Sequence, residues 1–419
     1  MVWNILTGYY AIDMDKHAIK STLSSRKSSW LVERLLLRNL FQRLRRPAIR
    51  ICLWDTTCEG TATPDQPVLL IQQRRAFWRL LRNPELYFGE DYCSGTLDIQ
   101  GSLVTLLEAI LRAHEQPQRS ATRVRYKHRS QYSIPVRKAK RNSMHHYDLG
   151  NDFYRLWLDK EMIYTCAYFE ADNVSLDQAQ QAKHELICRK LQLKPGQTVV
   201  EAGCGWGALA LYMARHYGVT VKAYNVSHAQ IEEATRRAHA EGLTDHVEFI
   251  EDDYRNIRGC YDIFVSIGMV EHVGAGNYHI LGQVIDRVLA DNGRGLIHNI
   301  AQNQPVATNP WIQKYIFPDG YTPTLREMMD IFEPTNFSIV DLENLRLHYA
   351  LTLHHWLQRF ETHSEEVAAM FDDNFVRMWQ LYLSGSIANF TTGSLQLYQI
   401  LFQRPDVNVL PLTRQHLYT

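Results

Sequence analysis

Strand-like and helix-like segments alternate between residues 198 and 301, and this alternation constrains the fold more than any other feature of the chain. Apolar strand-like runs occur at TVVEA (198–202), TVKAYNV (220–226), VEFIEDD (247–253), DIFVSIG (262–268) and GLIHNIA (295–301). Segments of helical periodicity lie near 207–217, 228–241 and 276–291. Strands that alternate with helices form a parallel sheet covered by helices on both faces. We therefore predict a Rossmann-like α/β domain with a mostly parallel sheet.

The first part of the chain has a different pattern, in which short strand-like runs mix with helices. Strand-like runs cover Ile49–Trp54 and Val68–Ile71, and a helical pattern covers Leu103–His114. A basic, polar stretch follows, with a composition typical of a linker. We predict three parts, namely a smaller α+β domain over 1–118, a basic linker over 119–142 and the Rossmann-like domain over 143–419.

Charges balance over the whole chain but cluster locally. Lys and Arg total 45, as do Asp and Glu, so the formal net charge of +0 argues against a general nucleic-acid binder. Segment 119–141 is rich in Arg and Lys and has no acid, and arginines alternate with apolar residues along Ser28–Arg46. A basic amphipathic helix can lie on an anionic bilayer. An ordinary surface helix has the same pattern, so both interpretations stay open.

The seven cysteines form no CxxC pair and no spacing with histidine that is typical of zinc. We therefore expect no metal, no disulfide framework, and a protein of a reducing, cytoplasmic compartment. No apolar run approaches the length of a membrane span, and the N-terminus has no secretory apolar region. We expect any membrane contact to be peripheral, at the inner face.

The turn after the first strand, EAGCGWG (201–207), predicts a ligand site. Glycines between a strand and a helix leave backbone N–H groups at the helix start, with no Cβ to block a ligand. A dinucleotide site would use G-x-G-x-x-G and an acid after the second strand. Here the third glycine comes early, and Asn225 ends the second strand. With Glu201 two residues before the first glycine, the pattern favours S-adenosylmethionine over NAD.

Polar residues after the next strands fit the same ligand. Asn225 can bond ribose hydroxyls, and Asp252, Asp253 and Tyr254 follow the third strand, where an adenine would lie. Asp accepts from the exocyclic amine and Tyr stacks on the ring. A solvated acidic loop is the alternative for any one of them. His298 lies at the carboxyl end of one predicted strand and Glu271 at the end of the neighbouring one, which favours a functional role for His298 over that of a buried core histidine.

Several long strings resemble the cyclopropane-fatty-acyl-phospholipid synthases, a family that includes the mycolic acid cyclopropane synthases and related lipid C-methyltransferases. The strings are HYDLGNDFYRLWLD (146–159), YTCAYF (164–169), VEAGCGWG (200–207), GMVEHVG (268–274), NPWIQKYIFPDGY (309–321) and LQLYQILF (395–402). They occur in order from about Met144 to Arg404. The resemblance is weaker over the N-terminal part.

The resemblance implies an S-adenosylmethionine-dependent enzyme that converts the cis double bond of a phospholipid acyl chain into a cyclopropane, with bound bicarbonate as the base. The implied catalytic residues are Cys166, Glu271, His298, Ile300 and Tyr349. The implied cofactor contacts are Tyr164, Thr165, Glu201, Gly203, Cys204, Gly205, Asn225, Val226, Ser227, Gln230, Asp253, Tyr254 and Ile267. It also implies a homodimer, with the smaller domain serving lipid binding and dimerisation.

Three positions depart from the family's pattern. Thr165 replaces the usual Ser and keeps the hydroxyl, and Asn225 replaces the usual Thr. Ser386 stands where some members carry a cysteine once proposed as catalytic. A serine without a base partner is a poor nucleophile, so this chain favours the bicarbonate mechanism.

An alkene is a weak nucleophile, so its alignment with the sulfonium methyl and the exclusion of water must supply much of the catalysis. Methyl addition leaves a carbocation, which aromatic faces stabilise by about 0.5–2 kcal/mol each. The stretch Trp311–Tyr321 and the pair Tyr168-Phe169 provide such rings, and most of them are expected to line an acyl tunnel or the core. Within the bicarbonate site, Glu271 is expected to accept the anion's O–H.

The sequence leaves three other functions open. A lipid C-methyltransferase giving a methyl-branched or methylene product shares the first steps. A small-molecule N-methyltransferase on the same scaffold would need neither the bicarbonate site nor a basic docking surface. A peripheral lipid-binding protein without activity is disfavoured by the presence of Glu271, His298 and Tyr349 together.

Overall fold

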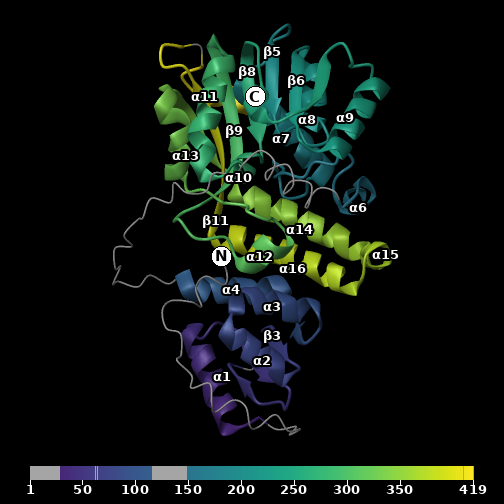
Figure 1. The fold of residues 1–419 in the computed structure, drawn as a ribbon, viewed down its shortest axis with the longest axis vertical. Coiled ribbons are helices and arrows are strands. Elements are labelled where there is room, and N and C mark those ends of the chain that lie inside the picture. The colour runs from purple at the N-terminus through teal and green to yellow at the C-terminus, as the bar shows by residue number, and fades with distance from the viewer. Residues whose placement is uncertain (1–28, 62, 64, 116–148, 409, 419) are drawn as a thin grey trace. The chain divides into compact units, whose positions relative to one another are not determined.

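The computed structural model describes residues 29–61, 63, 65–115, 149–408 and 410–418 (Figure 1). It divides into two compact units, neither of which is one continuous stretch. The smaller unit combines the N-terminal part with 306–315 and 364–394. Among the described residues, the larger unit combines 149–305, 316–363 and the part of the chain from 395 onward. The predicted linker, 119–142, lies outside the described residues.

A seven-stranded sheet in the order β10-β11-β9-β8-β5-β6-β7 forms the centre of the larger unit. Its parallel part contains β5 (Thr198–Ala202), β6 (Thr220–Asn225), β7 (Val247–Glu251), β8 (Tyr261–Ile267) and β9 (Leu289–Gln302). The chain reverses direction along the sheet between β5 and β8, and ligands bind at such a switch point. The predicted Rossmann-like, mostly parallel sheet is confirmed.

Two strands at one edge run antiparallel and were not predicted. They are β10 (Ser338–Asn344) and β11 (Leu395–Gln403), and β11 pairs with β9 from Leu395 opposite Gln302 to Gln403 opposite Arg294. Strand β9 begins earlier than the predicted run 295–301, and its pairing with β8 already includes Leu289 opposite Tyr261. The β9–β11 pairing brings the side chains of Gln399 and His298 to opposite positions on neighbouring strands.

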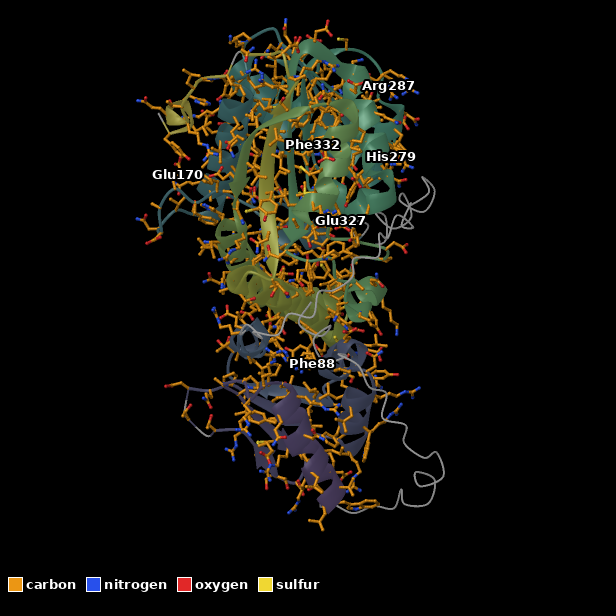
Figure 2. The ribbon with its side chains drawn as sticks, turned by 90° about the vertical axis from the view of Figure 1, so that its left-hand side faces the viewer. Phe88, Glu170, His279, Arg287, Glu327 and Phe332 are labelled. Carbon is orange, nitrogen blue, oxygen red and sulfur yellow. A yellow bond between two sulfur atoms is a disulfide. The ribbon has the colours of Figure 1, made fainter. Side chains whose placement is uncertain are left out.

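Helices cover both faces of the sheet, as Figure 1 shows. On one face α11 (Tyr278–Val288) and α13 (Leu325–Phe332) complete an apolar core, in which the ring of Phe332 lies 5.1 Å from that of Phe402 (Figure 2). On the other face a second core involves α7 (Leu176–Leu191), α8 (Ala208–Tyr217) and α9 (His228–Ala240). Four further elements of this unit are α6 (Asn151–Trp157), the 3-10 helix η1 (Tyr254–Asn256), α10 (Val270–Val273) and α14 (Arg346–Thr362).

The smaller unit has a four-stranded sheet in the order β2-β1-β3-β4. The strands are β1 (Arg50–Leu53), β2 (Cys58–Glu59), β3 (Val68–Ile71) and β4 (Leu97–Gln100). The helices are α1 (Leu31–Arg43), α2 (Arg74–Arg82), α3 (Pro84–Cys93), α4 (Leu103–Glu115), α12 (Pro310–Tyr315), α15 (Ser364–Met370) and α16 (Asp373–Thr392). The mixture of strands and helices agrees with the predicted α+β character.

The boundary between the units differs from the predicted division at residue 143. Helix α12 packs on α3, where a Cβ on Gly89 would lie 2.4 Å from the Trp311 ring. Lys314 and Tyr315 both bind the Glu90 carboxylate, at 2.8 and 3.0 Å. Helix α16 packs on α3 and α4. The sequence could not predict that α12 and α16 belong to the smaller unit, because this depends on packing between segments far apart in the chain.

The expectation of no disulfide is wrong. Cys52 and Cys58 are opposite each other in the antiparallel pair β1–β2, and a disulfide joins them with Cα atoms 4.1 Å apart. The signal in the sequence was the six-residue separation of Cys52 and Cys58, which is longer than a CxxC spacing. The cysteines therefore give no argument for a reducing compartment.

Helix α1 presents apolar side chains to solvent beside arginines. Leu31, Val32 and Leu35 are 79, 55 and 66% exposed, whereas Glu33 points inward, where its carboxylate binds Arg74 and the Trp78 indole N–H. The exposed cations along and just after α1 are Arg34, Arg38, Arg43, Arg45 and Arg46. No helix among the described residues combines the length and apolar character that crossing a bilayer requires.

Candidate active site

The glycine turn lies at the carboxyl end of β5, as predicted. Gly203, Gly205 and Gly207 have φ values of 86°, 54° and 80°, the left-handed region that glycine adopts without strain. The N–H groups of Gly203 and Cys204 both donate to the carbonyl of Tyr224 at the end of β6, at 2.9 and 3.1 Å. The turn therefore follows a fixed path from β5 into α8. A Cβ on Gly205 would meet no atom within 4 Å, so this backbone is open to a ligand.

Asn225 connects the glycine turn to α9. Its amide nitrogen donates to the carbonyl of Gly205 (3.3 Å) and to Oε1 of Gln230 (2.7 Å), and its Oδ1 accepts from the N–H of Val226 (2.8 Å). Ser227 caps α9 through the N–H of Gln230. The four predicted cofactor residues of this segment therefore form one hydrogen-bonded group at the sheet edge. The role of Asn225 toward a ribose stays a prediction.

Glu201 is buried at the end of β5, and its Oε2 has no hydrogen-bond partner among the described residues. Burial raises the pKa of this carboxyl to about 7, and the nearby Lys183 ammonium opposes the shift. A buried polar atom without a partner is costly. An amine or hydroxyl donor of a bound ligand would satisfy it.

Helix α7 supplies two buried polar side chains that we did not predict. Gln180 donates from Nε2 to the carbonyl of Thr165 (2.9 Å), and Nζ of Lys183 donates to the Thr165 hydroxyl (3.3 Å). Burial lowers the pKa of Lys183 to about 8, while Asp159, Cys166 and Glu201 oppose the shift. The signal available in the sequence was a glutamine and a lysine three residues apart in the segment that forms α7, which we did not predict as a helix. Lys183 thus places a cation between Thr165 and Glu201.

Tyr164 belongs to a cluster of aromatic rings. Its ring centroid lies 5.2 Å from those of Trp157 and Trp356, and Trp356 in turn lies 6.0 Å from Tyr349. Tyr154 of α6 lies 5.6 Å from Tyr164. The cluster therefore connects a predicted cofactor residue with a predicted catalytic residue through adjacent rings.

The residues after β7 make contacts within the protein that we did not predict. Asp253 caps η1, and its two carboxylate oxygens accept from the Arg255 guanidinium at 2.8 and 3.2 Å. Tyr254 lies in the apolar core, with the Arg255 guanidinium 5.2 Å from its ring. Contacts of these residues with an adenine stay predictions. Cys204 and Ile267, the two remaining cofactor residues, are both buried in the other core.

Glu271 lies on α10, directly after β8, and reaches across to β9. The N–H of Ile300 donates to Glu271 Oε1 at 2.6 Å. Its Oε2 is shielded from solvent and accepts no hydrogen bond from the described residues. Burial raises the pKa of Glu271 to about 7, against the lowering effect of the Ile300 N–H. The structure thus brings Glu271 and Ile300 into direct contact.

His298 lies two residues before Ile300 on β9, so both side chains point to the same face. Its carbonyl accepts from the N–H of Gly268 at 2.8 Å. Its Nδ1 lies 3.1 Å from Nε2 of Gln399, and its Nε2 has no partner within the described part of the chain. Burial, with Lys183 and Lys190 nearby, lowers the pKa of His298 to about 3. The ring is therefore neutral.

Cys166 and the backbone of Tyr349 share one hydrogen-bond acceptor at the start of α14. The carbonyl of Leu345 accepts from the N–H of Tyr349 (3.1 Å) and from the thiol of Cys166 (3.9 Å). The N–H of Leu345 donates to the carbonyl of Leu397, which is opposite Ile300 in the β9–β11 pair. Burial raises the pKa of the Cys166 thiol, so it is not a thiolate. A continuous set of contacts thus joins four of the five predicted catalytic residues, and His298 is two positions away on the same strand.

Ser386 and part of the predicted aromatic stretch lie in the smaller unit. The hydroxyl of Ser386 donates to the carbonyl of Tyr382 within α16, at 2.9 Å, as a helical serine commonly does. Trp311 and Tyr315 contact α3, as described above. In the larger unit Tyr168 stacks on His348 with 4.7 Å between ring centroids.

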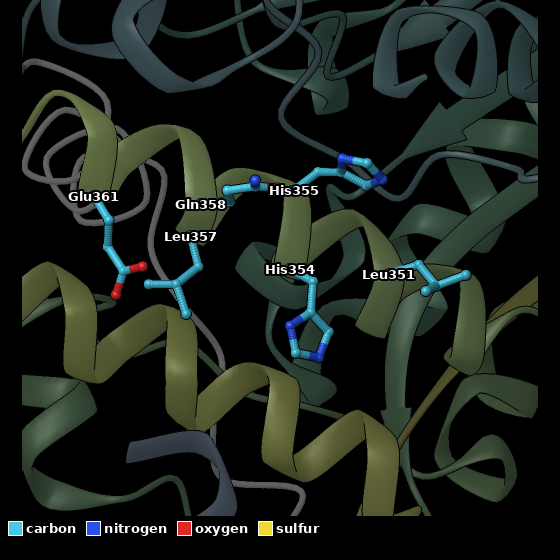
Figure 3. Close-up of a pocket in the computed structure, with 6 residues that line it drawn as sticks. All are labelled: Leu351, His354, His355, Leu357, Gln358 and Glu361. Carbon is cyan, nitrogen blue, oxygen red and sulfur yellow. The ribbon is translucent and has the colours of Figure 1, made fainter. Parts of the chain in front are cut away.

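A surface pocket lies along α14 (Figure 3). Its lining residues are Leu351, His354, His355, Leu357, Gln358 and Glu361. None of them is a predicted site residue, although Tyr349 lies on the same helix. The pocket therefore does not coincide with the site built from Glu271 and His298.

Comparisons with known proteins show the family to which the chain is similar. Residues 135–400 match the family described as mycolic acid cyclopropane synthetase, and residues 36–122 match a domain of unknown function, DUF7884. A probable fatty acid methyltransferase of Pseudomonas putida is 34% identical over 88% of this chain and 96% of its own length. A cyclopropane-fatty-acyl-phospholipid synthase of Escherichia coli K12 is 38% identical over 81% of this chain and 88% of its own length.

Solved structures of similar fold are the cyclopropane synthase MmaA2 and the mycolic acid cyclopropane synthase CmaA1 with SAH and CTAB. MmaA2, from Mycobacterium tuberculosis, has a TM-score of 0.61 at 28% identity and covers 64% of this chain and 98% of its own. CmaA1 has a TM-score of 0.60 at 29% identity and covers 63% of this chain and 98% of its own.

Proposed function

The chain belongs to the mycolic acid cyclopropane synthetase family of S-adenosylmethionine-dependent methyltransferases, and on that premise we propose that it forms a cyclopropane ring on a phospholipid acyl chain. The substrate is an unsaturated acyl chain with a cis double bond, the methylene unit comes from S-adenosylmethionine, and bound bicarbonate is the general base. The observation that carries this proposal is that two buried polar atoms near the carboxyl ends of β8 and β9, Glu271 Oε2 and His298 Nε2, have no hydrogen-bond partner among the described residues.

The residues of the glycine turn fit S-adenosylmethionine. Glu201 offers a buried carboxylate oxygen that lacks a partner among the described residues, Gly205 offers backbone without an obstructing Cβ, and Lys183 offers a cation beside Thr165. The methionine moiety carries an amine that can donate to Glu201 and a carboxylate that can bind Lys183. Asn225, Val226, Ser227 and Gln230 would hold the ribose side, and Asp253, Tyr254 and Ile267 the adenine.

The residues around Glu271 fit a small anion that also carries an O–H group. A neutral His298 with a proton on Nε2 donates to an anion, and so does the hydroxyl of Tyr349. Glu271 Oε2, as a carboxylate, accepts the O–H and raises the basicity of the bound species. Bicarbonate has both features. A simple anion without an O–H would leave the Glu271 carboxylate facing it in repulsion.

S-adenosylmethionine, when bound, supplies an electrophilic methyl group, and bicarbonate supplies the base that takes up the proton lost on ring closure. The chain's own part is to exclude water, hold the reactants and stabilise the positive charge on the acyl chain. The rings of Tyr164, Trp356 and Tyr349 run from the cofactor residues to the anion residues. Aromatic faces there would attract the charge by cation–π interaction at about 0.5–2 kcal/mol each.

A lipid C-methyltransferase that gives a methyl-branched or methylene product is the second candidate. It is favoured by similarity to the Pseudomonas putida fatty acid methyltransferase and to the tuberculostearic acid methyltransferase UfaA1 of Mycobacterium tuberculosis, which is 33% identical over 85% of this chain. The purified protein, given cis-unsaturated phospholipid vesicles and S-adenosylmethionine, separates the two. The cyclopropane product gains one CH2 and shows ring protons by NMR, whereas a methyl-branched product shows none.

Access to a phospholipid requires contact with a bilayer. We propose peripheral binding to an anionic membrane surface through α1, where Leu31, Val32 and Leu35 are exposed beside arginines. Apolar insertion and attraction of basic residues to anionic lipid act together in such helices. The predicted second basic stretch, 119–141, lies outside the described residues. A homodimer through the smaller unit remains part of the proposal.

A further inference from the structure

A chain of three buried polar side chains leads from α7 through β11 to the catalytic histidine. Nζ of Lys190 donates to Oε1 of Gln399 at 2.7 Å, and Nε2 of Gln399 lies 3.1 Å from Nδ1 of His298. The three residues are 1, 1 and 2% exposed. Glu343 of β10 also binds the Lys190 ammonium. Helix α7, β10 and β11 thus hold the chain from three sides.

The direction of each hydrogen bond in this chain follows from chemistry alone. A lysine ammonium has no lone pair and only donates, so the group of Gln399 that faces Lys190 must be its carbonyl oxygen. The amide NH2 of Gln399 must then face His298. An amide NH2 only donates, so Nδ1 of His298 must accept and carries no proton. In a neutral imidazole the proton is then on Nε2.

We propose that Lys190 and Gln399 are positioning residues that fix His298 in its Nε2–H tautomer and so aim a hydrogen-bond donor at the anion of the active site. This inference rests on the proposed function for the identity of the anion, but not for the tautomer. Nε2 of His298 is buried and has no partner in the described part of the chain. The relay therefore ends on the atom that is left for a ligand.

The tautomer decides whether the site attracts or repels an anion. With the proton on Nε2, His298 and the Glu271 carboxylate form a donor and acceptor pair, which matches the O⁻ and O–H of one hydrogencarbonate. With the proton on Nδ1, a lone pair of His298 Nε2 and a lone pair of the Glu271 carboxylate would both face the anion. The Lys190 ammonium is in turn neutralised by the Glu343 carboxylate, so the relay does not depend on a buried unpaired charge.

The alternative is an ordinary polar network that stabilises the β9–β11 pair without setting the tautomer. The two interpretations differ in a property that can be measured on the wild-type protein. Nitrogen NMR of protein labelled with 15N-histidine separates protonated from unprotonated ring nitrogens. The His298→Asn variant assigns the signals among the 18 histidines. We expect a protonated Nε2 and an unprotonated Nδ1 for His298 at pH 8, and the opposite tautomer would overturn the inference.

A near-isosteric variant tests the role of Gln399 directly. In Gln399→Glu the carboxylate keeps the contact with Lys190 but can only accept, so the proton of His298 should move to Nδ1. The activity should then fall by about 10- to 100-fold, the usual effect of removing a group that orients a histidine ligand. The matched control is Gln396→Glu on the same strand. Gln396 is also buried, and its Oε1 accepts from Asn344 at 2.8 Å, a bond that glutamate retains.

Retention of the Nε2–H tautomer in Gln399→Glu, or a changed tautomer with unchanged activity, would each contradict the proposal. If Gln399→Glu fails to fold, Lys190→Met carries the test, because the released amide can turn and the Nδ1–H tautomer should then appear. The bicarbonate dependence of the rate is measured separately. A rate independent of bicarbonate with the predicted tautomer would refute the proposed anion and leave the relay standing.

Discussion

The backbone N–H of Ile300 donates to Oε1 of Glu271 at 2.6 Å, which fixes a carboxylate from α10 against the end of β9. The other oxygen of that carboxylate is left buried and unpartnered among the described residues. One carboxylate oxygen of Glu271 thus fixes the position of the side chain, and the other is available to a ligand.

Replacing Glu271 should change the pH dependence of stability in a defined direction. Folding raises the pKa of this carboxyl from 4.5 to about 7 by burial, so the folded state favours the protonated form. Its stabilising contribution is present below pH 4.5 and is lost as the pH rises through 7, on the order of 3 kcal/mol in total. Glu271→Gln stays neutral, so its Tm relative to wild type should increase from pH 5 to pH 8. Thermal unfolding measures this, with the exposed Glu232→Gln as control.

The same variant should lose at least about 100-fold in activity, because a carboxamide cannot orient a base as a carboxylate does. Wild-type activity should rise with pH through about 7 as Glu271 ionises. A constant offset in Tm between variant and wild type over this range, together with a flat pH profile, would show that Glu271 does not titrate as described.

Lys183→Met should weaken the binding of ligands that carry the methionine moiety. The substitution removes the cation beside the Thr165 hydroxyl and the charge that opposes the raised pKa of Glu201. We expect at least a tenfold loss of affinity for S-adenosylhomocysteine, about 1.4 kcal/mol. Methylthioadenosine lacks the amino-acid group and serves as the matched ligand. Calorimetry should find its affinity little changed, whereas an equal loss for both ligands would indicate general damage to the fold.

Two glycines of the turn should respond differently to alanine. Gly207→Ala would place a Cβ 2.4 Å from the Phe249 ring and 2.9 Å from Ala234, whereas Gly205→Ala would meet nothing within 4 Å. Both have positive φ and both variants carry that strain, about 1–2 kcal/mol. Thermal unfolding should therefore show a clearly larger loss for Gly207→Ala. We expect Gly205→Ala to weaken S-adenosylmethionine binding more than it lowers Tm. Equal Tm values for the two variants would contradict the packing described here.

Leu31→Ser with Leu35→Ser should reduce binding to anionic vesicles. Both side chains are more than half exposed, so their loss should cost little stability, and each buried leucine contributes about 1.5–3 kcal/mol to insertion. Vesicle sedimentation should show a drop of at least tenfold in the partition coefficient. Leu412→Ser is the control, since Leu412 is fully exposed elsewhere. Equal effects of the two changes would argue against α1 as the docking element.

Local patterns predicted much of the parallel sheet. The predicted bounds of β5 and β3 agree with the structure to the residue, because apolar runs between turn residues determine them. The antiparallel strands β10 and β11 were missed, since their register depends on β9 as a partner. The compact units were also missed in part, because α12, α15 and α16 join the N-terminal segment by tertiary packing.

In the site, too, local motifs could be predicted and tertiary contacts could not. The glycine turn, Glu271 and His298 could be chosen from motifs, because their chemistry is visible in single residues. Gln399, Lys190 and Lys183 could not, because each is defined by what it faces across strands or from a helix. A buried lysine on an apolar helix face is a local signal that Lys183 and Lys190 share, whereas Gln399 has no such signal.

The rate of methylene transfer to cis-unsaturated phospholipid vesicles, measured in buffer depleted of carbon dioxide and then titrated with bicarbonate, tests the central claim most directly. We predict that depletion slows the wild-type protein, that added bicarbonate restores the rate along a saturable curve, and that Glu271→Gln is not restored. A wild-type rate that does not depend on bicarbonate would contradict the account.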